Sequence, residues 1–230
     1  MKTIGIIGGM SWESSAEYYR LINENIKSRL GPTHSAELVM YSMDFQRAAQ
    51  LELEERWSEL AMLLIGAITR LEKAEADFVL MASNTAHQVA EIVQRSINVP
   101  LLHIADVTAE EIAKAGISTV GLLGTRFVME QDFYKERFRA KGIDVVVPDR
   151  VARDYVHNVI FNELCAGKLI PESKQKIQTM ILDLQRAGAE AVVLACTELP
   201  LLIHVEDTPV RLFDTMALHV NKAVTLALEE

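Results

Sequence analysis

The chain of 230 residues is long enough for one large domain or two small ones, and half of its residues are hydrophobic, which supports a sizeable core and argues against disorder. Its 23 basic and 32 acidic side chains give a formal charge of −9, which argues against binding to nucleic acid or anionic membranes, because both attract basic proteins. The two cysteines have no metal-ligand spacing, and the sequence shows neither a signal peptide nor about 18 successive apolar residues, so we expect a cytoplasmic protein without disulfides or a metal site.

Strands and helices are expected to alternate through the first half of the chain. The pattern predicts strands over 3–7, 37–41 and 77–82 and helices over 14–30, 58–74 and 86–96. The charge-rich segment before the second helix is expected to form a solvated face, with its charged side chains Glu52, Glu54, Glu55 and Arg56 exposed. Ser83, Asn84 and Thr85 are residue types that cap helices, and His87 is expected to be a buried structural histidine.

The second half continues the same alternation. It predicts strands over 120–123, 143–147, 191–195 and 210–213 and helices over 106–115, 127–141, 154–165, 172–187 and 216–228. Such spacing is typical of parallel sheets. We therefore predict an α/β fold of two pseudo-symmetric subdomains, each a parallel sheet flanked by helices, with the active site in the cleft between them. The last strand and helix are expected to return to the first half, so the subdomains are 1–98 plus 207–230 and 99–206.

Two segments of the first half have an echo in the second. Residues 71–83 and 184–196 share a leucine, a basic residue, Ala-x-Ala, an acid, an apolar strand and an alanine before Ser83 or Cys196. Thr3-Ile-Gly-Ile-Ile-Gly8 likewise matches Thr119-Val-Gly-Leu-Leu-Gly124. These matches indicate an internal duplication, in which Ser83 and Cys196 are equivalent residues facing one cleft; chance similarity between amphipathic strands is the alternative.

Cys196 directly follows a predicted buried strand, and the carboxyl ends of parallel strands are where such sheets place their chemistry. Amides of the next helix are expected to favour the thiolate. Inverting a carbon stereocentre needs a base on one face and an acid on the other, and two equivalent groups across a cleft supply that pair without a cofactor, with backbone amides stabilising the enolate-like charge. An inert buried cysteine is the alternative for Cys196, and packing is the expected role of Cys165.

Three segments resemble the aspartate/glutamate racemase superfamily, over essentially the whole chain. Gly8-Gly9-Met10-Ser11 matches its opening loop, Asn84-Thr85-Ala86-His87 its Cys-Asn-Thr-Ala-His motif except at the cysteine, and Ala195-Cys196-Thr197-Glu198-Leu199 its second motif. The resemblance implies a cofactor-independent amino-acid racemase, often a homodimer, acting on aspartate or glutamate. It implies that Ser83 and Cys196 are catalytic. The residues it places at the substrate are Met10, Ser83, Asn84, Thr85, Thr125, Cys196, Thr197 and Glu198.

Ser83 departs from the family, which usually has its first catalytic cysteine there. The serine could belong to a racemase that favours one direction of proton transfer, could be an engineered replacement, or could mark a one-thiol decarboxylase or isomerase of a small diacid. A non-catalytic amino-acid-binding module is a further alternative. Whether Glu198 orients Cys196 or caps its helix stays open. An acidic substrate would need a basic partner, for which Arg47, Arg126 and Lys168 are candidates.

Overall fold

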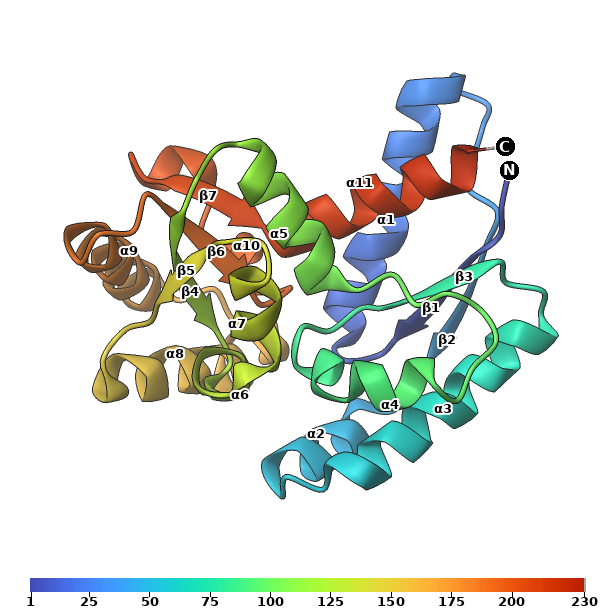
Figure 1. Ribbon diagram of the computed structural model, residues 1–230, viewed down its shortest axis with the longest axis horizontal. Helices are drawn as coiled ribbons and strands as arrows, with labels where there is room; N and C mark the ends of the chain where they lie inside the picture. Colours follow the sequence, from blue (N-terminus) through green and yellow to red (C-terminus); the bar gives the residue numbers. More distant parts are fainter. Residues whose placement is uncertain (230) are drawn as a thin grey trace. The chain divides into compact units, whose positions relative to one another are not determined.

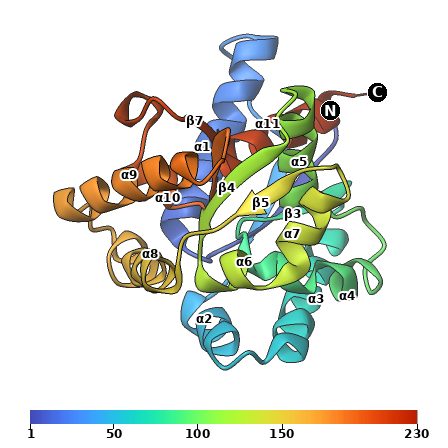
Figure 2. The same cartoon turned by 60° about the vertical axis from the view of Figure 1, so that its left-hand side comes forward.

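The computed structural model describes residues 1–229 and divides into two compact units (Figure 1). The first unit comprises Met1–Ile104 and the segment from His219 onward, and the second comprises Ala105–Leu218. Each contains a parallel β-sheet with helices packed on it, which Figure 2 shows from a second direction. The predicted α/β class with two helix-flanked parallel sheets is therefore confirmed.

The sheet of the first unit has the strand order β2-β1-β3, and all its strands are parallel. Its strands are β1 (Ile4–Gly8), β2 (Leu38–Ser42) and β3 (Phe78–Met81). The central strand β1 is buried along its whole length, which explains why its sequence is a continuous apolar run rather than an alternating one. Its helical elements are α1 (Trp12–Leu30), α2 (Phe45–Leu53), α3 (Trp57–Lys73), η1 (Thr85–Val89) and α4 (Ala90–Gln94).

The second unit has the strand order β5-β4-β6-β7, again entirely parallel. Its strands are β4 (Thr119–Gly124), β5 (Asp144–Val146), β6 (Ala191–Ala195) and β7 (Arg211–Asp214). Its helical elements are α6 (Arg126–Glu130), α7 (Asp132–Arg139), α8 (Arg150–Asn162), η2 (Leu164–Ala166), α9 (Pro171–Arg186), α10 (Leu199–Leu202) and η3 (Val205–Asp207). The orders β2-β1-β3 and β5-β4-β6 correspond, so the echoed sequence segments occupy equivalent strands of the two sheets.

The observed division of the chain differs from the expected boundaries at 98/99 and 206/207. Strand β7 pairs with β6, which places the segment 207–218 in the second unit rather than the first. Leu101 bridges Val79 of β3, which keeps 99–104 in the first unit. Chain order alone does not determine these assignments, because they depend on which sheet edge a short strand reaches.

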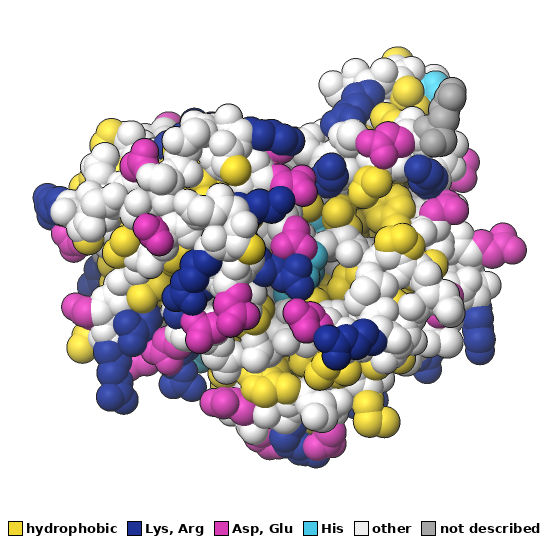
Figure 3. Space-filling view, viewed as in Figure 1, with side chains coloured by type: hydrophobic (Ala, Val, Ile, Leu, Met, Phe, Trp, Pro, Cys, Tyr) yellow, Lys and Arg dark blue, Asp and Glu magenta, His cyan; other side chains and the backbone are white. Residues whose placement is uncertain are grey.

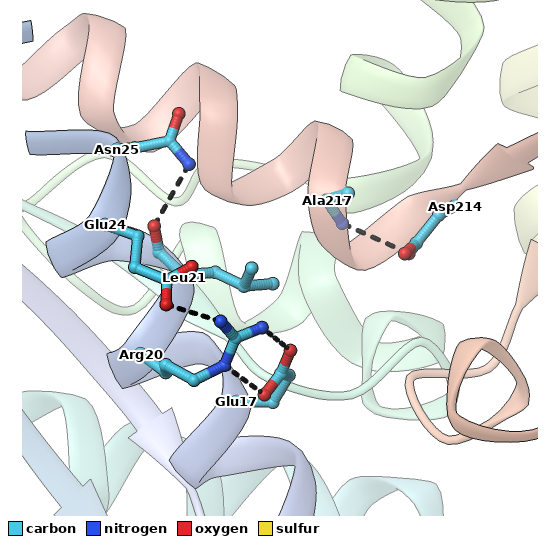
Figure 4. A network of polar contacts seen from close by, with 7 residues as sticks. All are labelled: Glu17, Arg20, Leu21, Glu24, Asn25, Asp214 and Ala217. Carbon is cyan, nitrogen blue, oxygen red and sulfur yellow. Dashed lines mark hydrogen bonds and ion pairs between the residues drawn. The ribbon is translucent and has the colours of Figure 1, made fainter. Parts of the chain in front are cut away.

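Helices α5 (Ile104–Lys114) and α11 (Thr215–Leu228) cross the observed boundaries between the units, which lie at 104/105 and 218/219. Asp214 begins α11 by accepting hydrogen bonds at Oδ1 from the backbone N–H groups of Met216, at 2.8 Å, and Ala217, at 3.1 Å; Figure 4 draws the second of these bonds. The helix then continues into the first unit, where Lys2 donates its backbone N–H to the carbonyl of Ala227 at 2.8 Å.

The helices differ from the sequence predictions in several places. The helix expected over 86–96 begins as the 3-10 helix η1 and continues as the short helix α4. Residues 45–53 form helix α2 within the segment expected to be a charge-rich solvated face; Asp44 caps it, and Glu52 is buried rather than exposed. The helix predicted over 127–141 is instead two helices, α6 and α7, separated at Gln131, whose backbone is extended. A cap and a one-residue break are short-range features that periodicity over many residues does not detect.

The exposed faces of the helices carry paired charges of both signs. On α1, Arg20 bonds to Glu17 and Glu24 one turn away on either side (Figure 4). On the face shown in Figure 3, basic and acidic side chains are interspersed rather than gathered by sign. Within residues 1–229, no helix is long and apolar enough to cross a membrane.

The core of the first unit contains a buried polar chain. The Tyr18 hydroxyl donates to His219 Nδ1 at 2.9 Å, and His219 Nε2–H donates to the carbonyl of Leu102 at 2.9 Å. Tyr18 and His219 are fully buried. Since one ring nitrogen accepts while the other donates, this network holds a neutral imidazole.

Candidate active site

The first candidate segment is the Ser83 turn, residues 82–85, which follows β3. The backbone N–H of Ala82 donates to the carbonyl of Ile7 at 2.9 Å, so the chain leaves β3 beside the end of β1. Ser83, Asn84 and Thr85 are all buried. Ser83 Oγ accepts a hydrogen bond from the backbone N–H of Ala86 in the first turn of η1 at 3.3 Å, whereas Asn84 at the N-cap makes no side-chain capping bond.

His87 fixes the backbone of the Ser83 turn. Its Nδ1 lies 2.7 Å from the carbonyl oxygen of Ser83, and its Nε2 accepts the backbone N–H of Ile104 at 3.3 Å. The acceptor role of Nε2 makes Nδ1 the protonated nitrogen, which donates to Ser83. The ring is buried and lies 4.5 Å from the ring of His103. The expected structural role of His87 agrees with these contacts, which hold Ser83 from its backbone side.

The loop after β1 lies beside the Ser83 turn, because β1 pairs with β3. Its backbone is tightly constrained. Ser15 Oγ accepts the backbone N–H of Gly9 at 2.7 Å and donates to the carbonyl of Ser11 at 2.7 Å. Gly9 has φ +86°, and a Cβ at this position would lie 2.1 Å from the carbonyl oxygen of Met43. Met10, the predicted substrate-lining residue, is buried. Only glycine fits at position 9, because both the backbone angle and the close approach exclude a side chain.

Gly9→Ala is expected to lower the free energy of unfolding by about 2–4 kcal/mol, because it combines an unfavourable backbone angle with an overlap against backbone atoms. Gly167→Ala is the control, since Gly167 has φ +68° in the left-handed region and its added Cβ would meet no atom within 4 Å. It should cost only about 1–2 kcal/mol, from the backbone angle alone. Urea unfolding curves measure both losses, and equal losses would contradict the tight packing at Gly9.

The second candidate segment is the Cys196 turn, residues 195–198, which follows β6. Gly124 of β4 pairs with Ala195 of β6, so Thr125 and Cys196 leave adjacent strands at the same edge. Thr125 Oγ1 accepts the backbone N–H of Val128 at 3.4 Å and thereby caps α6. Cys196 and Thr125 are buried. Both units thus place their predicted site residues just after the carboxyl ends of parallel strands.

Glu198 contacts the thiol directly. Cys196 Sγ donates to Glu198 Oε2 at 3.0 Å, and Thr197 Oγ1 donates to the same oxygen at 2.9 Å. Glu198 is 3% exposed, and although it precedes α10, its side chain makes no capping hydrogen bond. The Glu198 carboxylate therefore accepts hydrogen bonds from the thiol and from Thr197, and it does not cap α10.

The expectation that helix amides favour the Cys196 thiolate is wrong. Burial, and then the negative charge of Glu198, raise the pKa of the Cys196 thiol well above its ordinary value. A hydrogen bond from the Glu198 backbone acts in the opposite direction but is a smaller effect. Helix α10 has only four residues, so its dipole is weak. In the ligand-free protein Cys196 is therefore a neutral thiol at neutral pH.

The remaining candidates are distributed over both units. Cys165 lies in η2 and packs in the same hydrophobic cluster as Cys196, which agrees with a packing role. Arg47 on α2 and Lys168 are exposed. Arg126 is half-buried, and its backbone N–H donates to His157 Nδ1 at 3.3 Å. Among residues 1–229, no group of three or more His, Cys, Asp or Glu side chains is arranged to hold a metal ion.

The predicted site residues therefore form two groups. Met10, Ser83, Asn84 and Thr85 belong to the first unit, and Thr125, Cys196, Thr197 and Glu198 belong to the second. The sequence predicts these residues as site candidates but leaves the contact between Cys196 and Glu198 open. The two residues are two positions apart, and the direction of their side chains depends on the turn between strand and helix rather than on a regular period.

Comparisons with known proteins cover nearly the whole chain. Residues 7–223 match the family model described as Asp/Glu/Hydantoin racemase. A candidate Asp/Glu racemase from Yersinia pestis is 42% identical, with a TM-score of 0.91 and all of both chains covered. An aspartate racemase homologue from Pyrococcus horikoshii OT3 is 39% identical, with a TM-score of 0.86 and the same coverage. The broad specificity amino-acid racemase RacX from Bacillus subtilis (strain 168) is 24% identical over 231 residues, 98% of each chain.

Proposed function

The chain belongs to the Asp/Glu/hydantoin racemase family, and from this premise we propose that it racemises an amino acid without a cofactor, by proton transfer at the α-carbon between Ser83 and Cys196. The observation that carries the proposal is the pairing of a buried thiol with a carboxylate at the end of β6, while Ser83 occupies the equivalent place after β3. A thiol held beside a proton acceptor at a strand end is suited to proton abstraction.

In the proposed reaction, Cys196 acts as a thiolate and removes the α-proton, and the electron pair of the broken C–H bond remains on the substrate as an enolate-like carbanion. The Ser83 hydroxyl then delivers a proton to the opposite face. Ser83 Oγ already accepts the N–H of Ala86, which leaves its own proton available to be donated. Since a hydroxyl is a much weaker acid than a thiol, the two proton transfers differ in difficulty.

We propose an acidic amino acid as the preferred substrate. The support is the family and the similarity to an aspartate racemase homologue, whereas the relative from Bacillus subtilis has broad specificity. A side-chain carboxylate needs a cationic partner, and Arg47, Arg126 and Lys168 are the residues available for that role. Of these, Arg126 directly follows the predicted site residue Thr125.

Proton NMR in D₂O tests this proposal with separate samples of L- and D-aspartate, L- and D-glutamate and a panel of other amino acids. We expect loss of the α-proton signal, with the acidic amino acids exchanging fastest, because each carbanion formed is reprotonated by groups that equilibrate with solvent. Exchange limited to non-acidic amino acids would refute the substrate proposal alone. No exchange with any amino acid, in the protein as it stands and in Ser83→Cys, would refute the racemase proposal.

A second candidate function has one observation in its favour. The Ser83 turn contains no carboxylate next to its hydroxyl in the sequence, so Cys196 is the better equipped of the two groups. A decarboxylase or isomerase of a small diacid that uses only this thiol would turn over a malonate-type or maleate-type compound. Its activity would survive Ser83→Ala and disappear in Cys196→Ala, whereas racemisation should require both residues.

A further inference from the structure

The two echoed turns differ in the residue that accompanies the reactive group. Ser83-Asn84-Thr85 corresponds to Cys196-Thr197-Glu198, so a threonine stands in the first turn where the second has a glutamate. The carboxylate therefore occurs only beside the thiol. If the carboxylate takes part in proton transfer, it does so only on the face of the α-carbon that Cys196 serves.

The Glu198 carboxylate is held in place for such a role. One oxygen, Oε2, accepts from both Cys196 Sγ at 3.0 Å and Thr197 Oγ1 at 2.9 Å, and the residue is almost completely buried. The bond from Thr197 fixes the direction of the carboxylate, and the Cys196 thiol donates to the same oxygen. A buried carboxylate in this arrangement can receive a proton without any movement of the backbone.

We infer that Glu198 is the proton acceptor that converts the Cys196 thiol into the base of the reaction. The inference rests on the proposed function and names the step that precedes it. Because Cys196 is a neutral thiol in the ligand-free protein, it cannot remove an α-proton until it has lost its own. The contact at 3.0 Å provides the path for that loss.

The proton balance closes without a further reactant. First the Cys196 S–H bond breaks and an O–H bond forms on Glu198, which leaves a thiolate and a neutral carboxylic acid. The thiolate next forms a new S–H bond with the α-proton, and the substrate keeps the electron pair. Ser83 then gives its proton to the opposite face and becomes an alkoxide. After product release, solvent carries the proton of Glu198 to Ser83 and restores the initial state.

Glu198→Gln separates this role from simple orientation, because two measurements should move in opposite directions. Glutamine keeps a carbonyl that can accept the thiol hydrogen bond, but it is not a proton acceptor. We expect α-proton exchange to fall by about 100-fold. At the same time the pKa of Cys196 should fall, because the neighbouring negative charge is gone. The ultraviolet absorbance of the thiolate, titrated against pH and corrected with Cys196→Ser, measures this second effect without any substrate.

Glu190→Gln is the matched control, since Glu190 is a carboxylate of the same unit that accepts hydrogen bonds from Ser118 and Thr119 instead of the thiol. It should leave exchange and the thiolate titration unchanged. Glu198→Asp, with its shorter side chain, should retain more exchange than Glu198→Gln. Unchanged exchange in Glu198→Gln would overturn the inference, and so would lost exchange with an unchanged or raised thiol pKa, which indicates orientation alone. Absence of exchange in the unmodified protein would instead refute the proposed function.

Discussion

Cys196→Ala is expected to reduce α-proton exchange by at least about 1,000-fold, because it removes the only group in the proposed reaction that forms a bond to the α-proton of the starting enantiomer. The loss should appear in kcat rather than in KM, since alanine preserves the small, buried shape of the turn while deleting the thiol. Proton NMR in D₂O with the best substrate of the panel measures it. Exchange remaining within about 10-fold of the unmodified protein would mean that another base acts.

Cys165→Ala provides the control for this prediction. Cys165 is the other cysteine of the chain and packs in the same hydrophobic cluster as Cys196, but it lies in η2 rather than at the end of a central strand. Its replacement should change exchange far less than Cys196→Ala does, since Cys165 raises the pKa of the Cys196 thiol less than burial or Glu198 do. A comparable loss in both variants would indicate that disturbed packing, rather than the missing thiol, causes the effect.

Lowering the pH from about 6.5 to about 4 is expected to reduce the free energy of unfolding by about 3 kcal/mol through His219 alone. Burial lowers the pKa of His219 from 6.5 to about 4, because its ring has no access to solvent, while the hydrogen bond to the Leu102 carbonyl acts in the opposite direction and is a smaller effect. The unfolded chain therefore binds a proton in this pH range that the folded protein excludes. The stabilisation is fully present above the pKa that His219 has in the unfolded chain. It is lost as the pH falls from that value to the pKa of His219 in the folded protein.

Urea unfolding at a series of pH values measures this loss, and NMR of the imidazole identifies the residue. The His219 ring should stay neutral in the folded protein until about pH 4. His219→Gln removes the titrating group and should flatten the decline between about pH 6.5 and pH 4.5, whatever its effect on absolute stability. Titration of His219 near its ordinary pKa in the folded protein would contradict the buried Tyr18–His219–Leu102 chain.

The sequence was most informative where a feature repeats or follows a period. The apolar runs of β1, β3, β4 and β6 predicted these four strands, because strands covered on both faces need a continuous hydrophobic sequence. The motifs around Ser83 and Cys196 predicted the family that the comparisons show. The matching order of the two sheets places the echoed segments at corresponding strands.

Other features depend on contacts between distant residues, and these the sequence did not predict. The pairing of β7 with β6 depends on tertiary contacts, and it places residues 207–218 in the second unit instead of the first. Helix α2 depends on a cap at Asp44 and on burial of a glutamate, a residue type that usually stays exposed. The pKa shift of the Cys196 thiol was predicted in the wrong direction because burial and the neighbouring Glu198 carboxylate outweigh the backbone hydrogen bond that favours the thiolate.

The central claim is that two chemically unequal groups, Ser83 and Cys196, act on one α-carbon. The most direct test follows deuterium entry and inversion together, starting separately from each enantiomer of the best substrate in D₂O. Since the enantiomers have equal free energy, inversion must have the same kcat/KM in both directions. Exchange need not be equal, because Cys196 can remove and return a proton on its own face without Ser83.

We predict that one enantiomer exchanges faster than it inverts while the other does not, and that Ser83→Cys speeds inversion by about 10- to 100-fold in both directions. The contradicting result is that both enantiomers exchange no faster than they invert and that Ser83→Cys leaves inversion unchanged. In that case Ser83 and Cys196 are not the two groups that transfer protons on opposite faces of the α-carbon.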